Sequence, residues 1–513
     1  MQQMKRIICV VLVGALLCAM PLATNAQGEG LTAADVSMYP TIRLAGGFHW
    51  LYFDENDPEK KELAFNPEAV GEMLAPVLDG ALEALKALDF DRIIDLLVEA
   101  FQDWFGPIRM DENGESVAPN LSAEFSNWDD WTLYEANEFE FSFDWRLSPV
   151  ENAEKLHAYM EHLGTTRPGV EKYNFYAQSG SGPIMLAYLK LYDPALDHVA
   201  SVVFDITMHN GTTMWGELAK RKLVIDTEAV GKMSAASLGG MELGFELQPL
   251  LRILYESGLL EIVERVLKLA ANRIIDRVYD EILLPLVFTM PVFWNYVPRK
   301  DYEAAKKAMF RGDPKYAGLV AKLDDYHKNV MDHADEIILA AAKQVKVAVR
   351  AGYGMPMWPL GKGAGVQSDG TVDTAYASLG ATCAPIGEPF SFWYTQKVDD
   401  GHNHISPDRC IDASACLLPE QTWFALNKPH GTEHQYGGWY TWFKSATEKP
   451  TVFSREEYPQ FVEMVGPGEL YRAAYEPLAV KQAPAEWIQV LTTIGLWILK
   501  IWRWLLRLPL FWA

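Results

Sequence analysis

The run Y-N-F-Y-A-Q-S-G-S, residues 173–181, constrains the fold more than any other part of this chain. Its first residues are mostly apolar and suit a buried strand, and a helix is predicted from Pro183 onward. A small-x-Ser-x-small pattern between a strand and a helix is typical of a nucleophile elbow, where a tight turn forces the serine outward. Ala177 and Ser181 stand where that pattern prefers glycine. The pattern alone therefore fits either a nucleophile at Ser179 or an ordinary strand–helix turn.

The N-terminus has the features of a secretory signal. Lys5 and Arg6 precede an apolar run, residues 7–20, and small residues follow up to Ala26, where cleavage is predicted. A retained membrane anchor is the alternative, although the apolar run is short for a span. Removing the signal changes the net charge from −23 to −25. A chain this acidic is not expected to bind nucleic acid, because phosphate neutralisation needs clustered Lys and Arg.

Three cysteines follow the predicted signal: Cys383, Cys410 and Cys416. They allow at most one internal disulfide, so the chain is not a disulfide scaffold. A bridge from Cys383 to either of the other two, and three free thiols, are both open.

The C-terminal segment predicts a membrane contact. Residues 487–513 contain five tryptophans and no acidic residue, and Lys500, Arg503 and Arg507 share one helical face. The segment is expected either to lie in the membrane interface or to penetrate it while the cations remain at the headgroups. A helix docked on the body of the protein is the alternative.

The order of predicted elements indicates an α/β fold with a mostly parallel sheet. Strands are expected at 39–44, 139–145, 173–177, 198–206, 345–349 and 422–426, with helices at 67–105 and 150–162. Between the fourth and fifth strands lies a long helical insertion, in which Pro285 is expected to cut the amphipathic piece 251–284. Such an insertion would form a cap over the carboxyl edge of the sheet, where open α/β sheets bind ligands.

Three linked motifs resemble one known family. F-D-W-R-L-S-P at 143–149, the A-Q-S-G-S run and H-N-G-T at 209–212 are similar, in order and spacing, to the α/β-hydrolase lipases related to lecithin–cholesterol acyltransferase. The resemblance covers roughly residues 39–215 and 345–434. It implies an α/β-hydrolase fold with a large helical cap or lid, and Ser179 as nucleophile. Gln178 stands where the family has histidine, and Ser181 departs most from the elbow pattern.

A serine nucleophile needs an imidazole base and a carboxylate that orients it. In this fold the histidine follows the last strand, which predicts His430, with His434 as the alternative. Two segments of pattern Asp-x-x-aliphatic-Asp offer the acid. The family's Asp-Gly-x-Val run favours Asp369, whereas the shorter distance along the chain to the histidine favours Asp408 slightly.

The developing oxyanion needs two backbone N–H donors, predicted at Gly180 and at Gly47 or Phe48. The motif His402-x-His404, near Asp399 and Asp400, is interpreted as a solvated loop, and no metal or other cofactor is expected.

These features predict a secreted serine hydrolase, a lipase or carboxylesterase acting on lipid or other hydrophobic esters through an acyl-enzyme. A lipid acyltransferase of the same fold and a catalytically inactive, membrane-tethered binding protein are the alternatives. The expected parts are a signal peptide (1–26), two core segments (27–215 and 344–484), a helical cap or lid (216–343) and a tryptophan-rich, membrane-associated helix (485–513).

Overall fold

The computed structural model describes residues 39–44, 51–53, 62–65, 80, 84, 89–118, 121–123, 138–223, 275–357, 365–430, 438–466 and 469–472. Several predictions fall outside these residues: the signal peptide, the C-terminal helix, Gly47, Phe48 and His434. Among the residues that are described, no helix is both long and apolar enough to cross a membrane.

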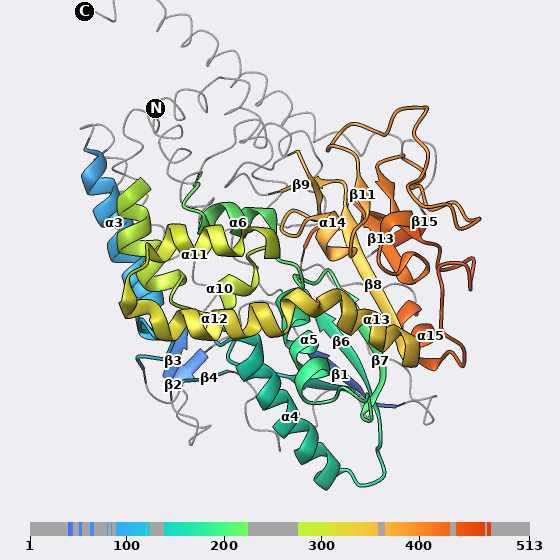
Figure 1. The fold of residues 1–513 in the computed structure, drawn as a ribbon, viewed down its shortest axis with the longest axis horizontal. Coiled ribbons are helices and arrows are strands. Elements are labelled where there is room, and N and C mark those ends of the chain that lie inside the picture. Colours follow the sequence, from blue (N-terminus) through green and yellow to red (C-terminus); the bar gives the residue numbers. More distant parts are fainter. Residues whose placement is uncertain are drawn as a thin grey trace, which may run out of the picture.

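An eight-stranded sheet organises the described chain, in the order β15-β14-β13-β8-β7-β6-β1-β5 (Figure 1). Seven neighbouring strands run parallel, and β15 is antiparallel at one edge. The α/β class and the mostly parallel sheet are therefore confirmed. The strands are β1 (Thr41–Leu44), β5 (Glu138–Phe141), β6 (Tyr173–Gln178), β7 (Val199–Asp205), β8 (Lys346–Tyr353), β13 (Thr422–Leu426), β14 (Phe461–Gly466) and β15 (Glu469–Arg472).

Seven further strands in the described part of the chain form three small sheets. The first contains β2 (Leu51–Phe53), β3 (Glu62–Phe65) and β4 (Leu121–Ala123), and the other two are the pairs β9 (Met355–Pro356) with β10 (Gln367–Ser368) and β11 (Thr382–Cys383) with β12 (Ile411–Asp412).

Helices cover both faces of the large sheet, because successive strand residues point to opposite sides. On one face Phe175 and Val202 join the main core, against which α4 (Pro149–Thr166), α5 (Gly182–Leu191) and α13 (Ala334–Gln344) pack. On the other face the next residues, Tyr176 and Val203, pack against α15 (Trp439–Ser445). The helix α13 comes from the end of the segment predicted to be a cap, yet it contacts α5 and β8.

The remaining helices lie mostly between β7 and β8. They are α6 (Thr213–Ala219), η5 (Val278–Val287), α10 (Val292–Asn295), α11 (Tyr302–Phe310) and α12 (Ala317–Asn329), with α3 (Phe90–Phe105) and the short α14 (Thr374–Ala377) elsewhere. Pro285 does not cut its helix as predicted. Residues 278–287 form a π-helix with Pro285 inside it, and the Phe288 N–H donates to the Leu283 carbonyl five residues back (2.8 Å).

Candidate active site

Ser179 occupies a strained turn between β6 and α5. Its φ is 51°, a left-handed conformation that costs a non-glycine residue about 1–3 kcal/mol. The strand ends at Gln178, a short 3-10 turn covers 179–181, and α5 begins at Gly182. This geometry matches a nucleophile elbow, in which strain at the serine aims its hydroxyl away from the sheet.

Ser181, the residue that departs most from the elbow pattern, is accommodated by hydrogen bonds. Its hydroxyl lies 2.6 Å from the Leu44 carbonyl and 2.8 Å from the Gln178 carbonyl, and it accepts the Gln178 N–H at 2.9 Å. The side chain therefore ties the elbow to the end of β1. The close approach falls one residue later, where a Cβ on Gly182 would meet the Thr207 Cβ at 2.5 Å.

His430 lies beyond the end of β13 and contacts the elbow serine. Its Nε2 is 2.7 Å from the Ser179 hydroxyl oxygen, and its side chain is 7% exposed. The His430 backbone N–H also donates to the Asp369 carbonyl at 2.9 Å. The ring is thus positioned to accept the serine proton.

Asp369 faces the other ring nitrogen. Its Oδ2 lies 2.8 Å from His430 Nδ1, while its Oδ1 accepts the backbone N–H groups of Thr371 (3.0 Å) and Val372 (2.8 Å). One oxygen is therefore used by the local turn, and the other is directed at the imidazole. The structure brings together Ser179, His430 and Asp369 in the geometry of a catalytic triad.

The slight preference for Asp408 as the partner of the histidine was wrong. Asp408 Oδ1 accepts from the Ser406 hydroxyl (2.5 Å) and from the Cys410 N–H (3.2 Å), so it caps a turn. Distance along the chain misled the prediction, because proximity here depends on neighbouring strands. Asp369 directly follows β10, which pairs with β9 just after the end of β8. β8 in turn pairs with β13 in the register Tyr353–Leu426, so the ends of these two strands lie side by side.

Tyr296 is a site residue that the sequence reasoning missed. A Cβ on Gly180, the predicted oxyanion donor, would overlap the Tyr296 hydroxyl. Burial raises the pKa of Tyr296 well above its ordinary value, so the hydroxyl stays protonated. Nothing in the helical insertion distinguishes this tyrosine from its neighbours. A small cavity of about 10 Å³ lies beside Gly180, lined by apolar residues such as Phe143, Trp145 and Ile184 and by the polar residues Asn152 and Asn295.

Residues of the flanking motifs support the scaffold. Arg146 and Asp144 form a buried ion pair (2.6 Å), and Ser148 caps α4. His209 is fully buried with its Nδ1 2.6 Å from the Thr207 hydroxyl, and burial lowers the pKa of His209 to about 4. Thr212 caps α6. The F-D-W-R-L-S-P and H-N-G-T runs therefore contribute packing and caps next to the elbow.

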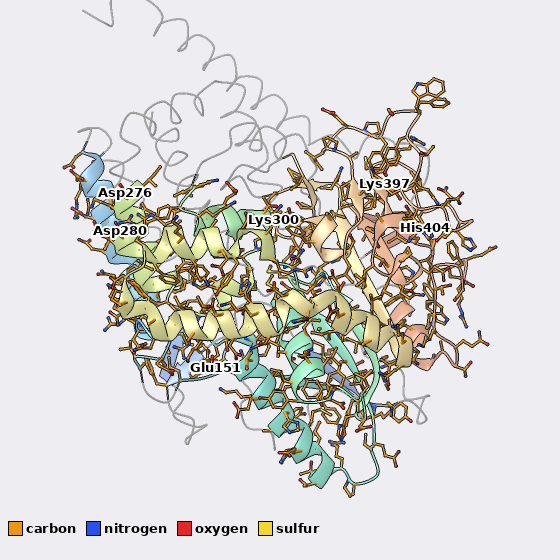
Figure 2. All side chains as sticks on the ribbon, viewed as in Figure 1. Glu151, Asp276, Asp280, Lys300, Lys397 and His404 are labelled. Atoms are coloured by element: carbon orange, nitrogen blue, oxygen red, sulfur yellow. The ribbon has the colours of Figure 1, made fainter. Side chains whose placement is uncertain are left out.

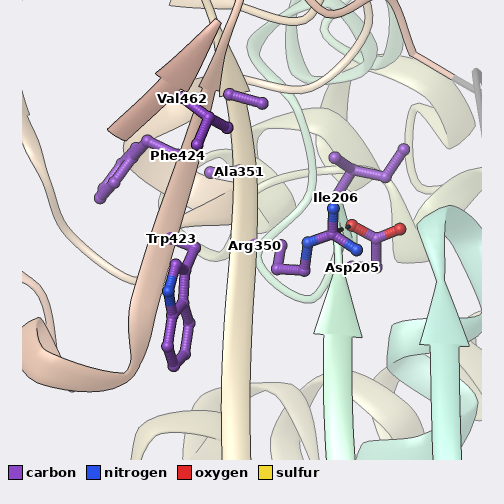
Figure 3. Close-up of a pocket in the computed structure, with 8 residues that line it drawn as sticks. Asp205, Ile206, Arg350, Ala351, Trp423, Phe424 and Val462 are labelled. Carbon is purple, nitrogen blue, oxygen red and sulfur yellow. Dashed lines mark ion pairs between the residues drawn. The ribbon is translucent and has the colours of Figure 1, made fainter. Parts of the chain in front are cut away.

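A buried polar cluster lies in the sheet behind the site. Figure 3 shows the ion pair of this cluster, in which Arg350 Nε is 3.8 Å from Asp205 Oδ1. Both residues also hydrogen-bond to the Tyr176 hydroxyl, at 3.1 and 2.7 Å. Lys428, two residues before the imidazole, is fully buried nearby, and burial lowers the pKa of Lys428 to about 8.

In the His402-x-His404 motif, His404 is hydrogen-bonded to other side chains of this protein. His404 is buried, and its ring nitrogens lie 2.9 Å from Gln460 Oε1 and 2.9 Å from Asp400 Oδ2. Within the part of the chain that the structure describes, no three His, Cys, Asp or Glu residues are grouped as a metal site would require. Cys383, Cys410 and Cys416 are free thiols in this structure.

A scan of protein families finds no match to the chain, and a search of curated proteins finds none either.

Proposed function

We propose that the protein is a serine carboxylic-ester hydrolase that acts on lipid or other hydrophobic esters. The observation that carries this proposal is the hydrogen-bonded series Asp369, His430 and Ser179, with the serine at a φ of 51°. In an ordinary strand–helix turn we would expect neither the strained backbone at the serine nor a buried imidazole next to its hydroxyl. The proposal accounts for both.

The reaction follows from the positions of the atoms. His430 Nε2 accepts the Ser179 proton as the serine oxygen attacks the ester carbonyl carbon. The Asp369 carboxylate keeps Nδ1 protonated and stabilises the imidazolium that forms. The imidazolium then gives its proton to the leaving alcohol as the ester C–O bond breaks. Water, deprotonated by the same imidazole, attacks the acyl-enzyme and releases the carboxylic acid, which restores Ser179.

Gly180 is proposed as one donor to the oxyanion, because the N–H after the nucleophile has this role in an elbow. The hydrophobic ester is proposed from the resemblance of the three sequence motifs to the lipase family, and large apolar side chains near Gly180, such as Phe143, Trp145 and Ile184, are compatible with it. The predicted signal and the tryptophan-rich segment favour action at a membrane outside the cytoplasm.

Labelling with a fluorophosphonate tests the proposal directly. We expect one phosphonate adduct on Ser179, found by peptide mass spectrometry, and no adduct in Ser179→Ala. Hydrolysis of p-nitrophenyl acyl esters should be lost in the same variant. A folded protein that takes no label would instead favour the inactive binding module. Acyl transfer would appear as a new ester when an alcohol acceptor is added.

A further inference from the structure

The segment Phe390–Tyr394, named here the aromatic turn, exposes two adjacent large aromatic side chains. Phe392 is 83% exposed and Trp393 is 84% exposed, the highest values among the large hydrophobic side chains in the described residues. Burying an aromatic ring is more favourable than leaving it in water, by about the transfer free energy of the ring. Such exposure is informative, whereas a single exposed leucine is not.

The fold holds this turn in place. The rings of Phe390 and Tyr394 stack at 4.0 Å between centroids, and the Tyr394 N–H donates to the Ser391 carbonyl at 2.9 Å. Arg409 donates from NH2 to the same Ser391 carbonyl at 2.8 Å, and the Tyr394 hydroxyl donates to Asp412 Oδ2 at 2.7 Å. Phe392 and Trp393 therefore project from a turn that is tied down at both ends.

The aromatic turn belongs to the loops that follow Asp369 in the chain, in the orange part of Figure 1. Lys397 and His404, which lie in the same loop region, are labelled on one side of the molecule in Figure 2. Residues 389–396 have the sequence P-F-S-F-W-Y-T-Q and carry no charge. Two further exposed hydrophobic side chains occur in this region, Val398 at 49% and Phe453 at 46%, and Phe453 stacks on His402.

We infer that the aromatic turn inserts Phe392 and Trp393 into the headgroup region of an electrically neutral lipid surface. Trp is enriched at membrane–water interfaces, where its ring is partly dehydrated and its N–H remains hydrogen-bonded. Two adjacent rings that project suit a fluid lipid layer, whereas a protein partner would need a matching pocket. A zwitterionic surface fits the uncharged turn and the acidic chain, which an anionic surface would repel.

This inference extends the proposed function by giving the enzyme a contact with the aggregate that holds its substrate. Its test does not depend on catalysis, because lipid binding is measured in the full-length chain with Ser179→Ala. Failure of the hydrolase proposal and failure of this one are then separate results.

The experiment measures flotation with phosphatidylcholine vesicles. We expect F392S/W393S to lower the partition coefficient ~10-fold or more, because each ring contributes more than one factor of ten when fully buried. The matched control is Tyr39→Ser, which removes an exposed aromatic ring (48%) just before β1, at the opposite, amino edge of the sheet. It should leave binding unchanged.

A second measurement avoids any question of folding. W393F keeps an aromatic ring but removes one indole. With vesicles of bromine-labelled phosphatidylcholine, the quenching of tryptophan fluorescence should therefore be smaller in W393F than in the parent protein, by the contribution of that indole. Absence of vesicle binding by the parent protein, equal binding by F392S/W393S, or unchanged quenching in W393F would each overturn the inference. A loss of self-association in F392S/W393S without a change in vesicle binding would assign the turn to a second copy of the chain and would overturn it too.

Discussion

Replacement of Asp369 by asparagine tests the site at its least obvious point, the choice between two aspartates in similar turns. In the parent protein Oδ1 accepts two backbone N–H groups, so the asparagine carbonyl oxygen must take that place. The new NH2 group then occupies the position of Oδ2, 2.8 Å from His430 Nδ1. Two donors cannot face each other, so Nδ1 must lose its hydrogen and Nε2 must carry it.

That tautomer cannot accept the serine proton, because its Nε2–H now points at the Ser179 hydroxyl. A carboxylate-to-amide change of this kind in a serine triad lowers kcat by about 10⁴-fold, which corresponds to about 5.5 kcal/mol of activation free energy. We expect D369N to show this loss in p-nitrophenyl ester hydrolysis and to label slowly with a fluorophosphonate. Circular dichroism and the thermal midpoint would show that the protein is folded.

The matched control is D408N, which changes the aspartate of the other turn. The Asp408 carboxylate accepts hydrogen bonds from the Ser406 hydroxyl and the Cys410 N–H, and neither residue is part of the site. We expect kcat to stay within about twofold, with a loss of unfolding free energy of about 0.5–1.5 kcal/mol. If D369N keeps more than a tenth of the activity, or if D408N loses as much as D369N, the assignment of the acid is refuted.

Three other changes test the elbow and its surroundings. Gly180→Ala should lower ester hydrolysis by about 10²-fold, because the new methyl group overlaps the Tyr296 hydroxyl, and adding Tyr296→Phe should restore part of the rate. Ser181→Ala should lower the free energy of unfolding in urea by about 1–3 kcal/mol, because the buried Leu44 carbonyl loses its hydroxyl donor; an unchanged value would show that the hydroxyl is not needed. Burial lowers the pKa of His327 to about 4 in the folded protein. Between pH 6.5 and pH 4 the unfolded chain therefore binds a proton at this histidine that the folded protein does not bind, so the free energy of unfolding decreases as the pH falls through that window. His327→Gln should reduce the difference in unfolding free energy between pH 7 and pH 5 by about 2 kcal/mol. An unchanged difference would contradict the lowered pKa of His327.

Much of the sheet could be predicted because its strands are short runs of buried apolar residues. The prediction for 422–426 coincides with β13, β6 extends one residue beyond its prediction, and β7 is one residue shorter than its prediction at each end. The strand expected at 139–145 ends at Phe141, since the Asp144 carboxylate accepts the Arg146 N–H and bends the chain. β14 and the edge strand β15 were missed.

The contact between the elbow and the histidine could be predicted for a different reason. The order of strand, serine and last-strand histidine along the chain implies that both lie at the carboxyl edge of one parallel sheet. Tyr296 could not be predicted, because its approach to Gly180 depends on how the insertion packs over the elbow. Contacts of this kind are set by tertiary packing and leave no local pattern.

The two look-alike aspartates show what a local pattern specifies and what it does not. In both turns the first aspartate accepts a backbone N–H two residues ahead, from Thr371 to Asp369 and from Cys410 to Asp408. The shared pattern therefore encodes a turn, which needs one carboxylate oxygen. Chemistry needs the second oxygen to be free and directed at an imidazole, and that depends on the pairing of β8 with β13. Asp369 has both because its turn follows β10, which pairs with β9 just after the end of β8, the strand next to β13.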